Sequence, residues 1–133
     1  MVLKIKDVKG VKVPLPNERI LKVLACPELG AGGDLTVLVS IITPGGGTGL
    51  HTHDVDEYMY VATGSGQSIC KGDVDEVASD SLIFAPKGVE HEIRNTGEES
   101  LKLFCVYVPA LKPAGYFEQA VAAARDSLGA DKS

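Results

Sequence analysis

The chain has 133 residues, of which 44% are apolar, and this length and composition suit one globular domain with its own core. Its formal net charge is −5, and residues 54–80 carry seven carboxylates against one lysine, a balance that would repel a phosphate backbone and argues against a nucleic-acid partner. The apolar runs are too short for a membrane span and the N-terminus lacks the apolar region of a signal peptide, so we expect a soluble cytoplasmic protein with no membrane partner.

The chain reads as a series of short extended segments followed by one helix. Residues 3–13 alternate apolar and charged side chains, as a half-buried strand does, and residues 35–43 are apolar and β-branched on both faces, which predicts a central strand. Further extended segments, separated by turn signals, are expected at residues 58–64, 66–72, 76–86, 91–97 and 101–109. Apolar residues then recur at the spacing of an amphipathic helix over about residues 114–128. Seven or eight short strands without an intervening helix indicate an all-β sandwich or barrel.

The chain has three cysteines, which are widely spaced, odd in number and not arranged in a CxxC pair. A disulfide framework would need paired cysteines at closer, regular spacing. We therefore expect Cys26, Cys70 and Cys105 to be reduced, and Cys105 to be a thiol of the core.

All three histidines of the chain lie in two short segments. On a strand, His51 and His53 would point to the same side, and Glu57 would share that side if the strand phase persists. His91 follows a Pro-x-Gly turn that would start another strand. Each histidine alone is more often a hydrogen-bonded or surface residue than a ligand. Asp56 would take the place of Glu57 if the strand phase slips by one residue, although a solvated turn carboxylate is the plainer interpretation.

Two segments around these residues match the two motifs of the cupin superfamily, so the chain resembles a small single-domain microbial cupin. The first motif, G(X)5HXH(X)3-4E(X)6G, is filled at every position by Gly45, His51, His53, Glu57 and Gly64. The second motif, G(X)5PXG(X)2H(X)3N, is filled by Pro86, Gly88, His91 and Asn95, with Asp80 in place of the leading glycine. Aspartate tolerates turn conformations well, and the ligand positions are unaffected by this departure.

The resemblance implies an all-β fold, a double-stranded β-helix or jelly-roll barrel with one short C-terminal helix. Residues 1–133 would form a single cupin domain, with the barrel over about residues 10–110. The resemblance also implies one divalent transition metal per chain, held by His51, His53, Glu57 and His91. Three imidazoles and a carboxylate suit Fe, Mn, Ni or Zn better than Ca or Mg, and the absence of thiolates argues against a structural zinc site.

Two further groups could take part in chemistry near this site. If the alternating residues 101–109 turn Cys105 and Tyr107 inward, the Tyr107 hydroxyl could serve as acid, base or substrate anchor, and Glu57 is a second possible catalytic group. Met59 and Val61 continue the inward phase of Glu57, as cavity-lining residues or, more simply, as ordinary core.

Fold does not select a reaction, because cupins with this ligand set include dioxygenases, isomerases, lyases and non-enzymatic binders. A metal with open positions can polarise a substrate oxygen or lower the pKa of a water. We expect a metalloenzyme for a small molecule, with dioxygenase favoured over isomerase or lyase. The alternative is a non-catalytic module that binds or senses a small ligand through the metal. We also expect a homodimer, because the N-terminal strand and the helix stripe offer more apolar surface than one barrel needs to cover.

Overall fold

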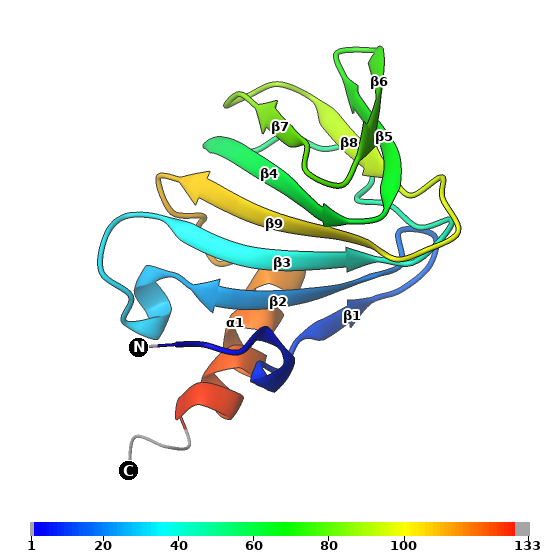
Figure 1. Ribbon diagram of the computed structural model, residues 1–133. Helices are drawn as coiled ribbons and strands as arrows, with labels where there is room; N and C mark the ends of the chain where they lie inside the picture. Colours follow the sequence, from blue (N-terminus) through cyan, green and yellow to red (C-terminus); the bar gives the residue numbers. More distant parts are fainter. Residues whose placement is uncertain (1, 130–133) are drawn as a thin grey trace.

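Two antiparallel β-sheets form the body of the protein in the computed structural model, which describes residues 2–129 (Figure 1). Six strands form one sheet in the order β1-β2-β3-β9-β4-β7, and three form the other in the order β6-β5-β8. The strands are β1 (Val11–Val13), β2 (Arg19–Ala25), β3 (Thr36–Ile42), β4 (Asp56–Thr63), β5 (Ser65–Cys70), β6 (Asp73–Ala78), β7 (Leu82–Ala85), β8 (His91–Arg94) and β9 (Leu101–Val108). This is the all-β, jelly-roll architecture that the sequence predicts.

The core lies between the two sheets and takes side chains from both. In β9, buried and more exposed residues alternate along the whole strand, so that one face turns inward. Leu103 of β9, Val61 of β4 and Ile93 of β8 are almost fully buried and belong to one apolar cluster. The alternation of these strands therefore sets which side chains face the interior.

The predicted C-terminal helix is observed as α1 (Gly115–Gly129), and it packs against β1 and β2 (Figure 1). Its apolar stripe is buried there, with Ala120, Val121 and Ala124 each less than 5% exposed. The stripe therefore completes the core of its own chain, and our expectation that it offers surface for a second subunit is wrong. Among the described residues, no helix is long and apolar enough to cross a membrane.

Three segments differ from the sequence-based expectation. Residues 3–13 do not form one strand, because residues Ile5–Asp7 form a 3-10 turn and only β1 pairs with β2. Residues 76–86 form parts of two strands, since Asp80 adopts a left-handed conformation with φ of 70° in the turn between β6 and β7. Strand β2 was not predicted, although its burial alternates with period 2 over most of its length.

Exposed apolar side chains gather on the outer face of the large sheet. Antiparallel register places Tyr58 of β4 opposite Phe84 of β7, and Tyr60 between Leu82 and Phe104. Each of these five side chains is between 37% and 67% exposed, and the Tyr58 and Phe84 rings stack with centroids 4.9 Å apart. We call these five residues the outer apolar face. The homodimer stays a prediction, and this face is one apolar surface that the barrel leaves uncovered.

Candidate metal centre

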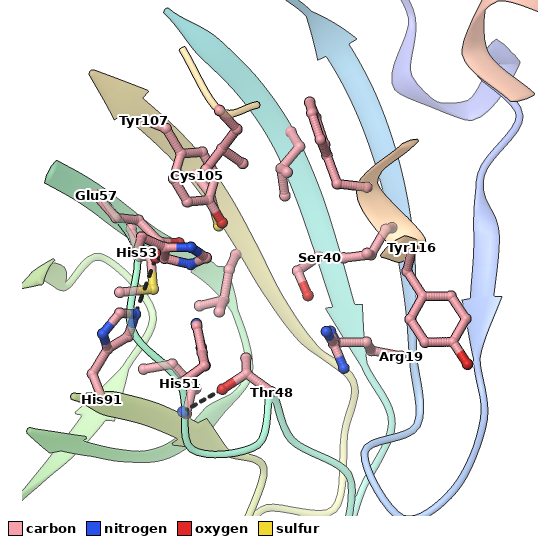
Figure 2. A pocket seen from close by; sticks show the side chains of 17 residues that line it. Arg19, Ser40, Thr48, His51, His53, Glu57, His91, Cys105, Tyr107 and Tyr116 are labelled. Atoms are coloured by element: carbon pink, nitrogen blue, oxygen red, sulfur yellow. Dashed lines mark hydrogen bonds and ion pairs between the residues drawn. The ribbon is translucent and has the colours of Figure 1, made fainter. Parts of the chain in front are cut away.

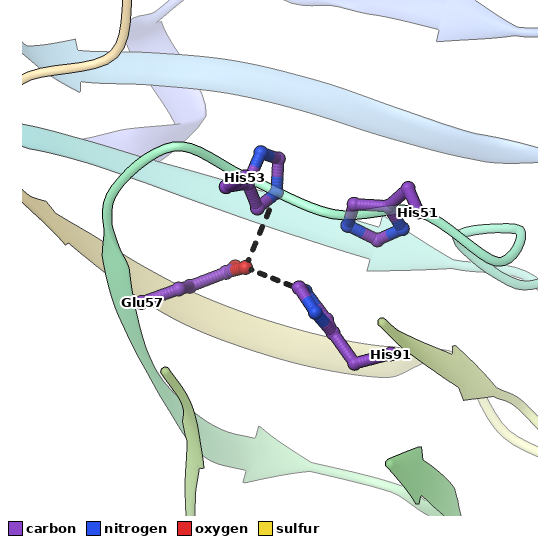
Figure 3. Close-up of side chains that lie close together, drawn as sticks. All are labelled: His51, His53, Glu57 and His91. Carbon is purple, nitrogen blue, oxygen red and sulfur yellow. Dashed lines mark hydrogen bonds and ion pairs between the residues drawn. The ribbon is translucent and has the colours of Figure 1, made fainter. Parts of the chain in front are cut away.

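The three histidines and Glu57 come together on one wall of the barrel, although they lie in separate segments (Figure 3). His51 and His91 pair across an isolated bridge, in which each backbone N–H donates to the other's carbonyl, at 3.0 and 2.9 Å. His53 lies in the loop that follows, and Glu57 is the second residue of β4. One ligand atom from each of the four residues lies within 4.8 Å of every other. The convergence arises from a bridge, a loop and two strands, so it does not depend on the strand phase persisting from His53 to Glu57.

Backbone contacts hold the loop that carries the first two histidines. The Thr48 N–H donates to the Ile93 carbonyl at 2.9 Å, and the Ile93 N–H donates to the Thr48 hydroxyl at 2.9 Å. A side chain at position 47 could not fit, because a Cβ on Gly47 would lie 2.8 Å from the Ile93 carbonyl oxygen. On the other side, the Gly88 N–H donates to the His53 carbonyl at 2.8 Å. The glycine-rich loop and the Pro-x-Gly turn thus fix the two motifs against each other.

Backbone carbonyls also orient two of the three imidazoles. His51 Nδ1 lies 2.7 Å from the Gly49 carbonyl oxygen, and His91 Nδ1 lies 2.8 Å from the Val89 carbonyl oxygen. A carbonyl can only accept, so each Nδ1 carries the proton and donates it. In the neutral ring, Nε2 is then left with a free lone pair that faces the cluster. A ligating histidine is typically held in this way by its second nitrogen.

The cluster fits a cation, as judged from the atoms that meet in it. His91 Nε2 lies 3.2 Å from Glu57 Oε1 and His53 Nε2 lies 3.4 Å from the same oxygen. The second contact does not have hydrogen-bond geometry, and among the described residues the buried His53 Nε2 has no hydrogen-bond partner. The lone pair of His91 Nε2 therefore faces a carboxylate oxygen, which is stable only if a proton or a metal ion lies between them, and a metal ion would also give the buried His53 Nε2 a partner. Three nitrogens and one carboxylate form a donor set that suits a first-row transition metal.

The electrostatics of the cluster favour an ionised Glu57. Burial raises the pKa of Glu57, but the contacts with His53 and His91 outweigh it and bring the pKa to about 2. Burial lowers the pKa of His51, which keeps that imidazole neutral and able to coordinate. For His91, burial opposes the charged form, but the contact with Glu57 is stronger and the net effect raises its pKa. An ionised Glu57 and a neutral His51 are the protonation states that metal binding requires, and a metal ion at the cluster would replace the proton that Glu57 favours on His91.

The cluster faces a cavity of about 260 Å³ inside the barrel (Figure 2). Tyr107 lines it, as the alternation of β9 predicts, and its ring packs edge-on against His53 with centroids 5.1 Å apart. Burial and the nearby Glu57 raise the pKa of Tyr107 well above its ordinary value, so its hydroxyl remains a donor. Met59 lines the cavity and also belongs to the core, whereas Val61 lies in the core away from the cavity lining.

Asp56 does not belong to the cluster. Its Oδ1 accepts a hydrogen bond from the Lys87 backbone N–H at 2.8 Å, and the side chain is on the opposite side of β4 from Glu57. The strand phase does not slip, so the alternative ligand that the sequence left open does not apply.

Sequence reasoning missed the polar groups on the wall opposite the histidines. Arg19 of β2 and Ser40 of β3 line the same cavity, and Tyr116 and Phe117 of α1 contribute to its lining (Figure 2). The signal for Arg19 was available, because Arg19, Leu21 and Val23 alternate along a segment that we did not assign to a strand.

Comparisons with known proteins agree with this geometry. A family model described as a cupin domain matches residues 38–107, which is more than half of the chain. An uncharacterized protein of Methanocaldococcus jannaschii, MJ1618, is 29% identical over 91 residues, covering 68% of this chain and 73% of that protein.

Two solved structures share the fold at lower identity. The crystal structure of a predicted oxalate decarboxylase from Thermotoga maritima superposes with a TM-score of 0.75 at 22% identity, covering 82% of this chain and 99% of that one. The polyketide cyclase RemF from Streptomyces resistomycificus superposes with a TM-score of 0.69 at 24% identity, covering 80% and 78%. From the matched family model, the two motifs and the shared barrel, the chain belongs to the cupin family.

Proposed function

We propose that His51, His53, Glu57 and His91 bind one divalent transition metal and that the protein is a metalloenzyme for a small oxygen-bearing molecule. The observation that carries the proposal is that four ligand atoms lie within 4.8 Å of one another on the wall of an internal cavity. A structural site is usually closed by a full tetrahedral shell, often with thiolates, whereas a site beside a cavity keeps positions for exchange.

A metal held here would act as a Lewis acid towards an oxygen atom of the ligand. The chain's own groups supply the rest of the site. The carbonyls of Gly49 and Val89 hold His51 and His91 in place, and the protonated Tyr107 hydroxyl can donate a hydrogen bond into the cavity. Apolar side chains form most of the remaining lining, and such surroundings strengthen the polar contacts made beside them.

Within this class we favour a dioxygenase, ahead of an isomerase or a lyase, because a mixed histidine and carboxylate set suits redox-active iron. The names of two proteins with the same fold, a predicted oxalate decarboxylase and a polyketide cyclase, support small-molecule enzymology in general. They share less than 25% identity with this chain and do not select the reaction.

Relaxation measurements test whether the site is open. The protein would be loaded with Mn²⁺ and titrated with oxalate, a small bidentate anion, while the relaxation rate of water protons is followed. We expect the loaded protein to enhance relaxation through exchangeable water, and oxalate to reduce that enhancement in the micromolar to millimolar range. No enhancement from a protein that holds one equivalent of Mn²⁺ would mean a closed structural ion, and the proposal would fail.

The identity of the metal that the protein acquires during gentle purification then distinguishes the dioxygenase from the other candidate functions. Iron, with a visible spectrum that changes when oxygen is admitted, would favour the dioxygenase. Zinc or nickel, without a response to oxygen, would favour an isomerase, a lyase or the ligand-binding module.

A further inference from the structure

Arg19 is a half-buried cation without an acidic partner among the described residues, and it points into the cavity from the wall opposite the histidines (Figure 2). Its Nη1 donates to the carbonyls of Asn17 at 3.0 Å and Gly47 at 3.3 Å, which anchors one side of the guanidinium. Among residues 2–129, no carboxylate lies within ion-pair distance of Arg19, and Nε and Nη2 make no hydrogen bond. The free edge of the guanidinium therefore has donors in the planar fork that binds a carboxylate.

Ser40 offers a second unused polar group in the same cavity. The residue is 4% exposed, and in the described part of the chain its hydroxyl has no hydrogen-bond partner. In the register of β2 and β3, Ser40 lies opposite Leu21, two residues along β2 from Arg19 and on the same inward face. A buried hydroxyl normally finds a partner, so its position beside an unpaired guanidinium indicates a ligand that supplies an acceptor.

Charge balance gives the class of that ligand. Imidazoles coordinate a metal ion as neutral ligands, so with a metal bound Arg19 and Glu57 are the charged side chains in the cavity lining. Their charges cancel, so a divalent metal leaves an excess of two positive charges in a space where burial already lowers the pKa of Arg19. A ligand with two negative charges, one at each end, would restore the balance.

We propose that Arg19 and Ser40 form a carboxylate-binding subsite and that the ligand of this cavity is a small dicarboxylate whose second carboxylate reaches the metal. Binding of the second carboxylate by the metal rests on the proposed function, whereas the carboxylate site at Arg19 rests only on the contacts of Arg19 and Ser40. The cavity of about 260 Å³ is smaller than the sites that hold drug-sized molecules, so it restricts the ligand to a few carbon atoms. One guanidinium without a second cation matches a carboxylate better than a phosphate dianion.

Calorimetric titration of the zinc-loaded protein tests the proposal with matched pairs of ligands. Succinate and butanoate share a chain length, as do glutarate and pentanoate, and each pair differs by one carboxylate. We expect the better dicarboxylate to bind at least about tenfold more tightly than its monocarboxylate partner, the range for a charge-assisted hydrogen bond. Inorganic phosphate serves as the competing anion, and phosphate binding more tightly than every carboxylate would overturn the assignment.

Variants then show which residues are responsible for the preference for dicarboxylates. Arg19→Gln should keep one equivalent of zinc and lose about tenfold or more in dicarboxylate affinity, and Ser40→Ala should lose less. Arg94→Gln is the matched control, because the Arg94 side chain is exposed and pairs with Glu92 outside the cavity. Arg19→Lys keeps the charge without the planar fork and should fall between wild type and Arg19→Gln. Dicarboxylate affinity unchanged in Arg19→Gln and Arg19→Lys would refute the subsite.

An NMR titration of the metal-free protein tests this inference separately from the proposed function. In the unloaded wild-type protein, acetate should shift the NMR signal of the Arg19 Nε–H group at millimolar concentration, while that of Arg94 stays in place. Absence of zinc binding together with this shift would refute the metal proposal and keep the subsite. Binding of one equivalent of zinc without any shift of the Arg19 signal would refute the subsite and keep the metal proposal.

Discussion

Replacing Asn95 by alanine should destabilise the fold more than any other single change in the second cupin motif outside the cluster. The Asn95 side chain is buried, and its amide nitrogen donates to the carbonyls of Ile42 at 2.9 Å and Glu99 at 2.8 Å. Its Oδ1 accepts from the Gly97 N–H at 3.0 Å. One side chain thereby joins the end of β3 to the turn between β8 and β9.

The expected loss in the free energy of unfolding depends on which polar groups lose their hydrogen-bond partner in the variant. A net hydrogen bond contributes about 0.5–1.5 kcal/mol, and a buried group left without a partner costs about 1–3 kcal/mol. Glu99 is exposed, so water can replace Asn95 at its carbonyl, but Ile42 is fully buried, so water cannot replace Asn95 there. We expect Asn95→Ala to lower the free energy of unfolding by about 2–4 kcal/mol, against a total of about 5–15 kcal/mol for a typical domain.

Urea unfolding followed by circular dichroism measures this loss. The protein should be metal-free, because metal binding would add its own contribution to stability. Thr96→Ala is the matched control, since Thr96 is the exposed neighbour of Asn95, and its effect should stay within about 0.5 kcal/mol. A loss below about 1 kcal/mol for Asn95→Ala, or an equal loss for Thr96→Ala, would refute this reasoning.

Three other expectations can be checked with purified protein. All three cysteines are free in the structure, two of them buried, so three thiols should react in denaturant without reductant, and one or fewer would contradict this. Light scattering should give twice the 14.0 kDa mass of one chain, and Phe84→Glu on the outer apolar face should shift that mass towards a monomer, whereas a monomeric wild type would count against the dimer. Tyr107→Phe should keep the bound metal but weaken oxalate binding severalfold, because it removes one donor from the cavity. Unchanged affinity in a Mn²⁺ relaxation titration would exclude Tyr107 from the site.

The residues that form the cluster were predictable from sequence because the spacing of two motifs specifies them. His51, His53, Glu57 and His91 converge although no continuous strand joins His51 to Glu57, since the His51–His91 bridge and the loop after it bring the side chains together. Strands with clear period-2 alternation, such as β9, were predicted with the correct inward face.

The opposite wall of the cavity was not predictable in the same way. The alternation of β2 could have shown that Arg19 shares a face with Leu21 and Val23, but its place opposite the histidines depends on the pairing of β2 with β3, which local pattern does not encode. Around Asp80 the strand pattern alone predicted one extended segment, whereas the second motif implied a turn there, and the left-handed Asp80 between β6 and β7 agrees with that turn. The docking of α1 on β1 and β2 likewise depends on tertiary packing, so an exposed stripe could not be told from a buried one.

Metal content in three proteins tests the central claim most directly. Wild type, Glu57→Gln and Asp56→Asn would be purified gently, reconstituted with Mn²⁺ or Fe²⁺, dialysed and measured by elemental analysis. Because Glu57 faces the three imidazoles while Asp56 binds the Lys87 backbone, we expect close to one equivalent in wild type and Asp56→Asn, and a large loss in Glu57→Gln. Less than about a tenth of an equivalent in reconstituted wild type, or equal retention in all three proteins, would contradict the assignment of this cluster as a metal centre.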